Sequence, residues 1–128
     1  MYRKEDIINR LNELNFNKDL YWITTGAAMV MYGLKEFTSD IDLGCDGELI
    51  SQLESNGVKA TILPDFTKRI LIEPDVEIFE NWGSGSIRFI DSFPVLSPES
   101  IIKVKKELGR DKDIKDIKIL EEFIVNFK

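Results

Sequence analysis

The sequence predicts an α+β fold in which helices pack on a mixed β-sheet. Segments with helical periodicity and segments with strand periodicity interleave along the chain, which favours this class over a helical bundle or a pure β-sandwich. The strand-like segments are short and are separated by glycine and proline, as expected for a small sheet. A length of 128 residues predicts one domain, residues 1–128.

The first half of the chain alternates between helix and strand. Isoleucine and leucine recur at helical spacing near the N-terminus, and a run of aromatic and β-branched residues follows as a buried strand. Gly26 then opens a short apolar helix that ends near Gly33. The expected ranges are helix 3–14, strand 20–25, helix 27–32, strand 39–44 and helix 46–56.

The second half contains several strand-like runs and then two helices. Ser97 is a suitable helix cap, and Pro98 fits the first helical position. The expected strands are 58–63, 69–72, 76–79, 87–90 and 93–96, and the expected helices are 97–108 and 111–127. The last helix is expected to bury an apolar face made of Ile114, Ile117, Leu120, Phe123, Ile124 and Phe127.

The composition excludes several functional classes. The 17 basic and 23 acidic residues give a net charge of −6, which does not favour nucleic acid as a partner because such proteins usually carry a basic face. The absence of histidine excludes imidazole bases and histidine-ligated zinc. The single Cys45 excludes an intrachain disulfide and is expected to be a buried structural thiol. No signal peptide or membrane-spanning run is evident, so we expect a cytoplasmic protein without membrane contact.

Two acidic residues, Asp40 and Asp42, alternate with apolar residues in the expected strand 39–44. Alternate strand residues share a face, so the two carboxylates should point the same way, about 7 Å apart at Cα. Two such anions repel each other unless a cation lies between them, and Mg²⁺ (or Mn²⁺) prefers carboxylate oxygens while leaving positions open for phosphates. Gly26 at a helix start lets the backbone approach a phosphate closely. The pattern predicts a metal-dependent phosphoryl or nucleotidyl transfer site, with a solvent-facing edge strand as the alternative.

These motifs resemble those of the DNA-polymerase-β-like nucleotidyltransferase superfamily. The matching features are Gly26 after a strand, a short helix, the run Thr38-Ser39-Asp40-Ile41-Asp42-Leu43, and Lys105 followed by Gly109-Arg110-Asp111-Lys112-Asp113. The sequence is most similar to the small bacterial and archaeal members called minimal nucleotidyltransferases, which include antitoxin-like proteins. The resemblance extends over residues 20–120 and implies a nucleotidyltransferase-like fold with a nucleoside triphosphate as substrate.

The resemblance also implies site residues. Superfamily members have a third carboxylate on a later strand, and Glu77 in Val76-Glu77-Ile78-Phe79 matches it, with Asp75 as the alternative. Asp40, Asp42 and Glu77 are thus the implied catalytic, metal-binding set. The implied nucleotide contacts are Gly26, Ala27, Ser39 and Lys105. For Lys105, the neighbouring Lys103 and Lys106 also favour a solvated helix face, whereas Arg110, Asp113 and Asp116 are expected to fix the helix–helix turn by ion pairs.

Two functions of different class follow. The first is an enzyme that moves a nucleoside monophosphate to a hydroxyl acceptor, on a protein side chain or a small molecule, with a partner protein favoured. The second is a catalytically weak or inactive module that binds a nucleotide or a partner protein, as an antitoxin would. The superfamily pattern has Gly-Gly or Gly-Ser where this chain has Gly26-Ala27, and this departure is what supports the second function.

Overall fold

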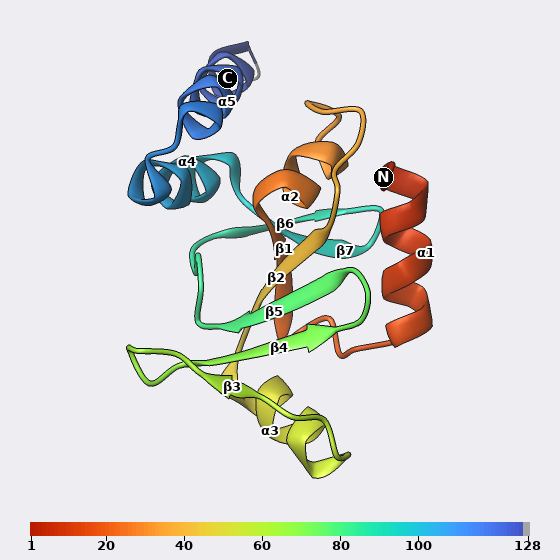
Figure 1. Ribbon diagram of the computed structural model, residues 1–128. Helices are drawn as coiled ribbons and strands as arrows, with labels where there is room; N and C mark the ends of the chain where they lie inside the picture. Colours follow the sequence, from red (N-terminus) through yellow and green to blue (C-terminus); the bar gives the residue numbers. More distant parts are fainter. Residues whose placement is uncertain (127–128) are drawn as a thin grey trace.

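The computed structural model describes residues 1–126, which form five helices and one seven-stranded mixed sheet (Figure 1). The α+β class is therefore confirmed. The helices are α1 (Lys4–Leu14), α2 (Thr25–Met31), α3 (Gly47–Ser55), α4 (Pro98–Leu108) and α5 (Asp111–Asn126). The strands are β1 (Tyr21–Thr24), β2 (Ile41–Cys45), β3 (Thr61–Ile62), β4 (Lys68–Ile72), β5 (Val76–Glu80), β6 (Ile87–Ile90) and β7 (Phe93–Leu96).

The sheet has the order β3-β4-β5-β2-β1-β7-β6, which places β2 and β1 at its centre. β1 pairs antiparallel with β2 and parallel with β7, and β2 pairs in parallel with β5. Apolar side chains of these four strands are fully buried: Ile23, Leu43, Ile78 and Val95. A residue in β2 therefore has a paired neighbour on each side. Asp42 lies opposite Thr24 of β1 and beside Glu77 of β5.

Helix α2 connects the sheet to the other helices. It contacts β1, β2 and β7, and both α1 and α4 contact it. Figure 1 shows α1 on one side of α2, α4 and α5 on the other, and α3 at the opposite end of the molecule from α5. The cap of α4 is as predicted, because the Ser97 hydroxyl accepts a hydrogen bond from the Ser100 backbone and Pro98 begins the helix. No helix within residues 1–126 has both the length and the apolar character needed to cross a membrane.

Two strands differ from the sequence prediction by more than one residue at an end. β2 begins at Ile41, not at Ser39, because Thr38 pairs with Tyr2 of the N-terminal segment and the chain bends before it enters the sheet. β3 covers only Thr61–Ile62, much less than the expected 58–63. Both of its residues are exposed at the sheet edge, where only β4 pairs with them.

Helix α5 keeps most of the predicted apolar face, since Ile117, Phe123 and Ile124 are half-buried, but it differs near its start. Ile114 was expected in the apolar face but is 52% exposed, whereas Leu120 is buried as predicted. The other buried positions are Asp113 and Asp116, which take part in ion pairs with α4. Charge pairing therefore sets the orientation of this end of α5. The expected Phe127 lies outside the described residues.

Candidate active site

Three carboxylates meet at one end of the central strands. Oxygens of Asp40, Asp42 and Glu77 all lie within 4.8 Å of one another. Asp42 and Glu77 are register neighbours on the parallel strands β2 and β5, so the sheet itself brings them together. Asp40 comes from the bend just before β2. Because β2 is a central strand, the alternative of a solvent-facing edge strand is wrong.

The electrostatics of the cluster favour a bound cation. Burial, followed by the neighbouring charges of Asp40 and Glu77, raises the pKa of Asp42 to about 6. The Thr25 hydroxyl donates a hydrogen bond to Asp42 Oδ2 at 3.2 Å and lowers that pKa in part. Arg69 Nε donates to Glu77 Oε2 at 2.7 Å. Three carboxylates held this close are a ligand set of the kind that Mg²⁺ or Mn²⁺ binds through oxygen.

The junction between β1 and α2 forms one wall of the site. Thr25 adopts a positive φ of 50°, which is uncommon for a β-branched residue and brings its hydroxyl to Asp42. Gly26 follows, and a Cβ there would lie 2.9 Å from Thr38 Oγ1. That hydroxyl donates to the backbone carbonyl of Asp40 at 3.2 Å. The absence of a side chain at Gly26 thus lets α2 begin directly beside the bend that carries Asp40.

A polar cavity of about 490 Å³ opens above the carboxylates. Six of the seven residues predicted for the site line it: Gly26, Ser39, Asp40, Asp42, Glu77 and Lys105. The seventh, Ala27, does not line the cavity and is 1% exposed in the core. The other lining residues are Met1, Thr25, Lys35, Phe37, Thr38, Arg110, Lys112 and Asp116.

Lys105 is buried in an ion-pair network, so the expectation of a solvated helix face is wrong for it. Its side chain is only 4% exposed, and its ammonium contacts Asp116 at 2.9 Å and Asp113 at 3.4 Å. Asp116 also accepts a hydrogen bond from Lys35 at 2.9 Å. Arg110 donates to both oxygens of Asp113 and lowers the pKa of this carboxyl to about 2. These contacts join α4, α5 and the loop after α2.

The structure separates the two alternatives for the third carboxylate. Asp75 lies just before β5, is buried, and accepts hydrogen bonds from Arg10 Nε at 3.0 and 3.2 Å. It does not line the cavity that contains Asp40 and Asp42. Of Asp75 and Glu77, only Glu77 places a carboxylate oxygen close to those of Asp40 and Asp42.

Sequence reasoning missed Thr25, Lys35 and Arg69. Thr25 directly precedes Gly26, so its position beside the site was available from the motif. Arg69 contacts Glu77 across the paired strands β4 and β5. A predicted hairpin over residues 68–80 would therefore have brought these two side chains close together. Lys35 reaches Asp116, 81 positions away, and no local pattern predicts such a contact.

Comparison with known proteins supports the fold. No protein-family model matches the chain, and a search of curated proteins finds no relative. Among solved structures, the chain is similar to the lincosamide antibiotic adenylyltransferase LnuA bound to lincomycin, at 17% identity and a TM-score of 0.55, over 90% of this chain and 92% of that one. It is also similar to a Thermotoga maritima protein provisionally assigned as a nucleotidyltransferase, at 19% identity and a TM-score of 0.60, over 98% and 96% of the two chains. The chain therefore has the nucleotidyltransferase fold, as the sequence resemblance implied.

Proposed function

We propose that this protein is a metal-dependent nucleotidyltransferase that moves a nucleoside monophosphate from a nucleoside triphosphate to a hydroxyl acceptor. The observation that carries the proposal is the convergence of Asp40, Asp42 and Glu77 at the base of a cavity with cationic residues in its walls. In this reaction the acceptor oxygen bonds to the α-phosphorus, the bond from that phosphorus to pyrophosphate breaks, and the hydroxyl proton is released.

The three carboxylates are the residues that would hold the divalent ions, with Mg²⁺ or Mn²⁺ as the metal. When bound, such ions supply the positive charge that favours an ionised acceptor hydroxyl and a leaving pyrophosphate. Thr25 and Arg69 fix the orientation of Asp42 and Glu77 through hydrogen bonds of 3.2 and 2.7 Å. The chain has no histidine, so a carboxylate of the cluster is the proposed proton acceptor.

The nucleotide phosphates are proposed to lie beside the start of α2. Gly26 and Ser39 line the cavity there, next to Asp40 and Asp42, so both backbone segments are accessible to a ligand. Ala27 contributes by its small size, since it packs into the core directly under the start of the helix. Lys105 is proposed to act on the phosphates indirectly. It contacts Asp116, a carboxylate that lines the cavity, at 2.9 Å and so offsets the repulsion between this carboxylate and the phosphates.

The acceptor is proposed to be a small molecule or a side chain of a partner protein. A volume of about 490 Å³ is within the range of small-molecule pockets. LnuA, which shares the fold, is described as an adenylyltransferase for lincosamide antibiotics and holds lincomycin in its structure. This precedent favours a small hydroxylated molecule as the acceptor.

A thermal-shift titration tests the proposal. The protein is heated with ATP, GTP, CTP or UTP, with and without Mg²⁺, beside the Asp42→Ala variant. We expect a stabilisation that requires both metal and triphosphate, because a ligand that binds only the folded state raises its stability. The variant should show no such shift. If no nucleotide shifts the wild-type protein under any of these conditions, the proposed function is wrong.

A second candidate is a module that binds the nucleotide without transferring it. The observation that favours it is Ala27, which has neither the hydroxyl of Ser nor the flexibility of Gly at the start of α2. Pyrophosphate release distinguishes the two functions. A protein that shows the metal-dependent shift but releases no pyrophosphate with any acceptor tested, water included, fits the binding module.

A further inference from the structure

We propose that Lys112, with Arg110 beside it, contacts the terminal phosphates of the nucleotide. This inference rests on the proposed function and assigns a role to Lys112, which the sequence motif contains but for which it implied no role. Among the described residues, four with cationic side chains line the cavity: Lys35, Lys105, Arg110 and Lys112. Three of these cations have anionic partners within the protein.

Lys35 and Lys105 are both engaged by the protein itself. Each places its ammonium 2.9 Å from the same oxygen, Oδ2 of Asp116, and Lys105 also contacts Asp113. Lys105 and Asp113 are almost completely buried. Turning Lys105 toward a ligand would leave buried carboxylates without their counter-ion, which is costly. These two lysines therefore stabilise the α4–α5 pair and are poorly placed to bind phosphate directly.

Lys112 has no hydrogen bond or ion pair with any residue among 1–126, although it lines the cavity. Its partner on a helix would normally be the residue four positions later, which here is Asp116. That carboxylate is already occupied by Lys35 and Lys105. Lys112 is also the second residue of α5, where the helix dipole disfavours a cation. No hydrogen bond or ion pair among the described residues therefore explains why a lysine occupies this position.

Arg110 complements Lys112 at the same turn. Its Nε and Nη2 donate to Asp113, which fixes the guanidinium, while half of the side chain stays exposed. Arg110 lines the same cavity as Asp40, Asp42 and Glu77, so a ligand bound over the carboxylate cluster can also reach the guanidinium. A phosphate chain that begins at the cluster and extends toward the α4–α5 turn would reach a fixed guanidinium and a free ammonium.

The experiment is calorimetric titration with the triphosphate that stabilises the wild-type protein most and with its monophosphate, both in Mg²⁺. We expect Lys112→Gln to weaken triphosphate binding about tenfold, because hydrogen bonds to charged groups contribute about 1.5 kcal/mol or more. Monophosphate binding should change less than about twofold. Lys112→Arg should restore most of the affinity because it keeps the charge.

Lys115→Gln is the matched control. It removes the same charge from the same helix, is exposed, and does not line the cavity. Equal triphosphate affinity in Lys112→Gln and wild type overturns this inference and leaves the proposed function intact. An equal loss in both glutamine variants also overturns it, since the effect would then reflect net charge. A wild-type protein that binds no triphosphate overturns both proposals.

Discussion

The carboxylates of the site are held in two different ways. Asp42 and Glu77 lie within paired strands, where backbone hydrogen bonds on both sides of β2 fix their separation. Asp40 lies outside the sheet, in the bend that follows the loop after α2. The position of Asp42 relative to Glu77 therefore depends on sheet register, whereas the position of Asp40 depends on contacts made by distant parts of the chain.

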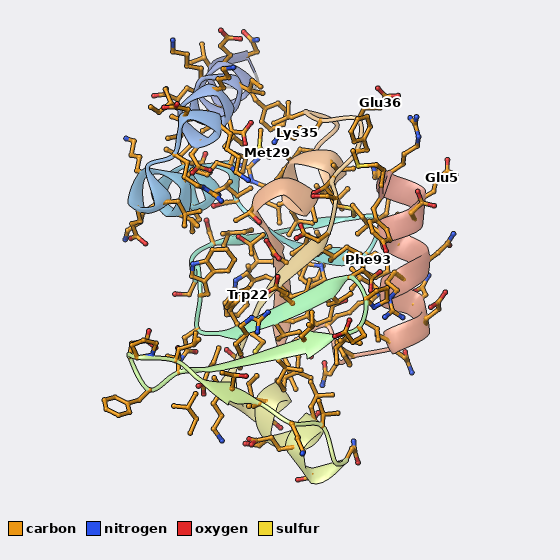
Figure 2. All side chains as sticks on the ribbon, in the orientation of Figure 1. Glu5, Trp22, Met29, Lys35, Glu36 and Phe93 are labelled. Atoms are coloured by element: carbon orange, nitrogen blue, oxygen red, sulfur yellow. The ribbon has the colours of Figure 1, made fainter. Side chains whose placement is uncertain are left out.

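Those contacts come from both ends of the sequence. Tyr2 and Thr38 exchange two backbone hydrogen bonds of 2.7 and 2.9 Å, and Arg3 pairs with Glu36. On the other side, Lys35 pairs with Asp116 of α5. Figure 2 shows this division, with Glu36 on the side of α1 and Lys35 on the side of α4 and α5. Two carboxylates of the site, Asp42 and Glu77, are therefore fixed by the core, and the third, Asp40, is fixed by the periphery.

The largest expected effect comes from breaking the α5 side of this support. Lys105→Met should lower the free energy of unfolding by about 3 kcal/mol, because it removes one partner of a buried charge network. Urea denaturation measures the change. Lys103→Met, an exposed lysine of the same helix, is the control and should cost less than about 0.5 kcal/mol. A loss no larger than that of the control would show that the network does not stabilise α5.

Asp42, which the sheet holds in place, should be essential for activity and dispensable for folding. Asp42→Ala is expected to reduce nucleotide transfer at least about a hundredfold, as loss of a metal ligand or its support does. Its thermal midpoint without metal should stay close to that of the wild type or rise, because the change removes repulsion among three carboxylates. Pyrophosphate release and a melting curve measure the two quantities. Full activity in this variant would falsify the metal assignment.

The same cluster predicts a pH dependence of stability in metal-free protein. The pKa of Asp42 is about 6 in the folded state and about 4 in an unfolded chain. The folded state thus binds the proton more tightly, and stability should fall as the pH rises from about 4 to about 6.5. Relative to Asp42→Asn, the wild type should lose about 1 to 2 kcal/mol across this window. Added Mg²⁺ should remove the loss, and a flat difference between the two proteins would contradict the raised pKa.

The smallest effect is expected at the N-terminal support of Asp40. Tyr2→Pro removes the backbone N–H that donates to Thr38 and should weaken Mn²⁺ binding about threefold, as the loss of one hydrogen bond's net contribution would. Calorimetric titration with Mn²⁺ measures it. Lys4→Gln breaks the nearby pair with Asp91 without affecting the loop, so it should leave the Mn²⁺ affinity unchanged. Equal affinities in all three proteins would show that Asp40 is positioned without the N-terminal segment.

The difference between residues held by local units and residues held by distant parts of the chain also explains how much of the fold and of the site could be predicted from the sequence. The elements, the mixed sheet and the set Gly26, Asp40 and Asp42 follow from local patterns, because their spacing lies within one strand-helix-strand unit. Glu77 was implied by the superfamily resemblance, which expects a carboxylate between apolar residues on a later strand, with Asp75 as the alternative. Of the residues that sequence reasoning missed, Lys35 depends on a partner far along the chain, whereas Thr25 and Arg69 contact site residues within local units of the fold.

Two residues illustrate the limit. Lys105 lies among other lysines, as a solvated residue would, yet α5 supplies two aspartates that bury it. Ile114 matches an apolar stripe but is exposed, because the ion pairs of Asp113 and Asp116 set which side of α5 faces α4. Apolar periodicity describes which face a helix would bury on its own, whereas the ion pairs with α4 determine which face α5 buries here.

The cavity is lined by residues that lie far apart in the sequence, from Met1 to Asp116, and this has a consequence for synthesis on the ribosome. Because chains emerge from the N-terminus, the strands that carry Asp42 and Glu77 are available well before α5. Lys35 acquires its partner only after Asp116 of α5 has been translated. A prematurely terminated product that ends before α5 therefore contains all three carboxylates and still lacks a complete cavity.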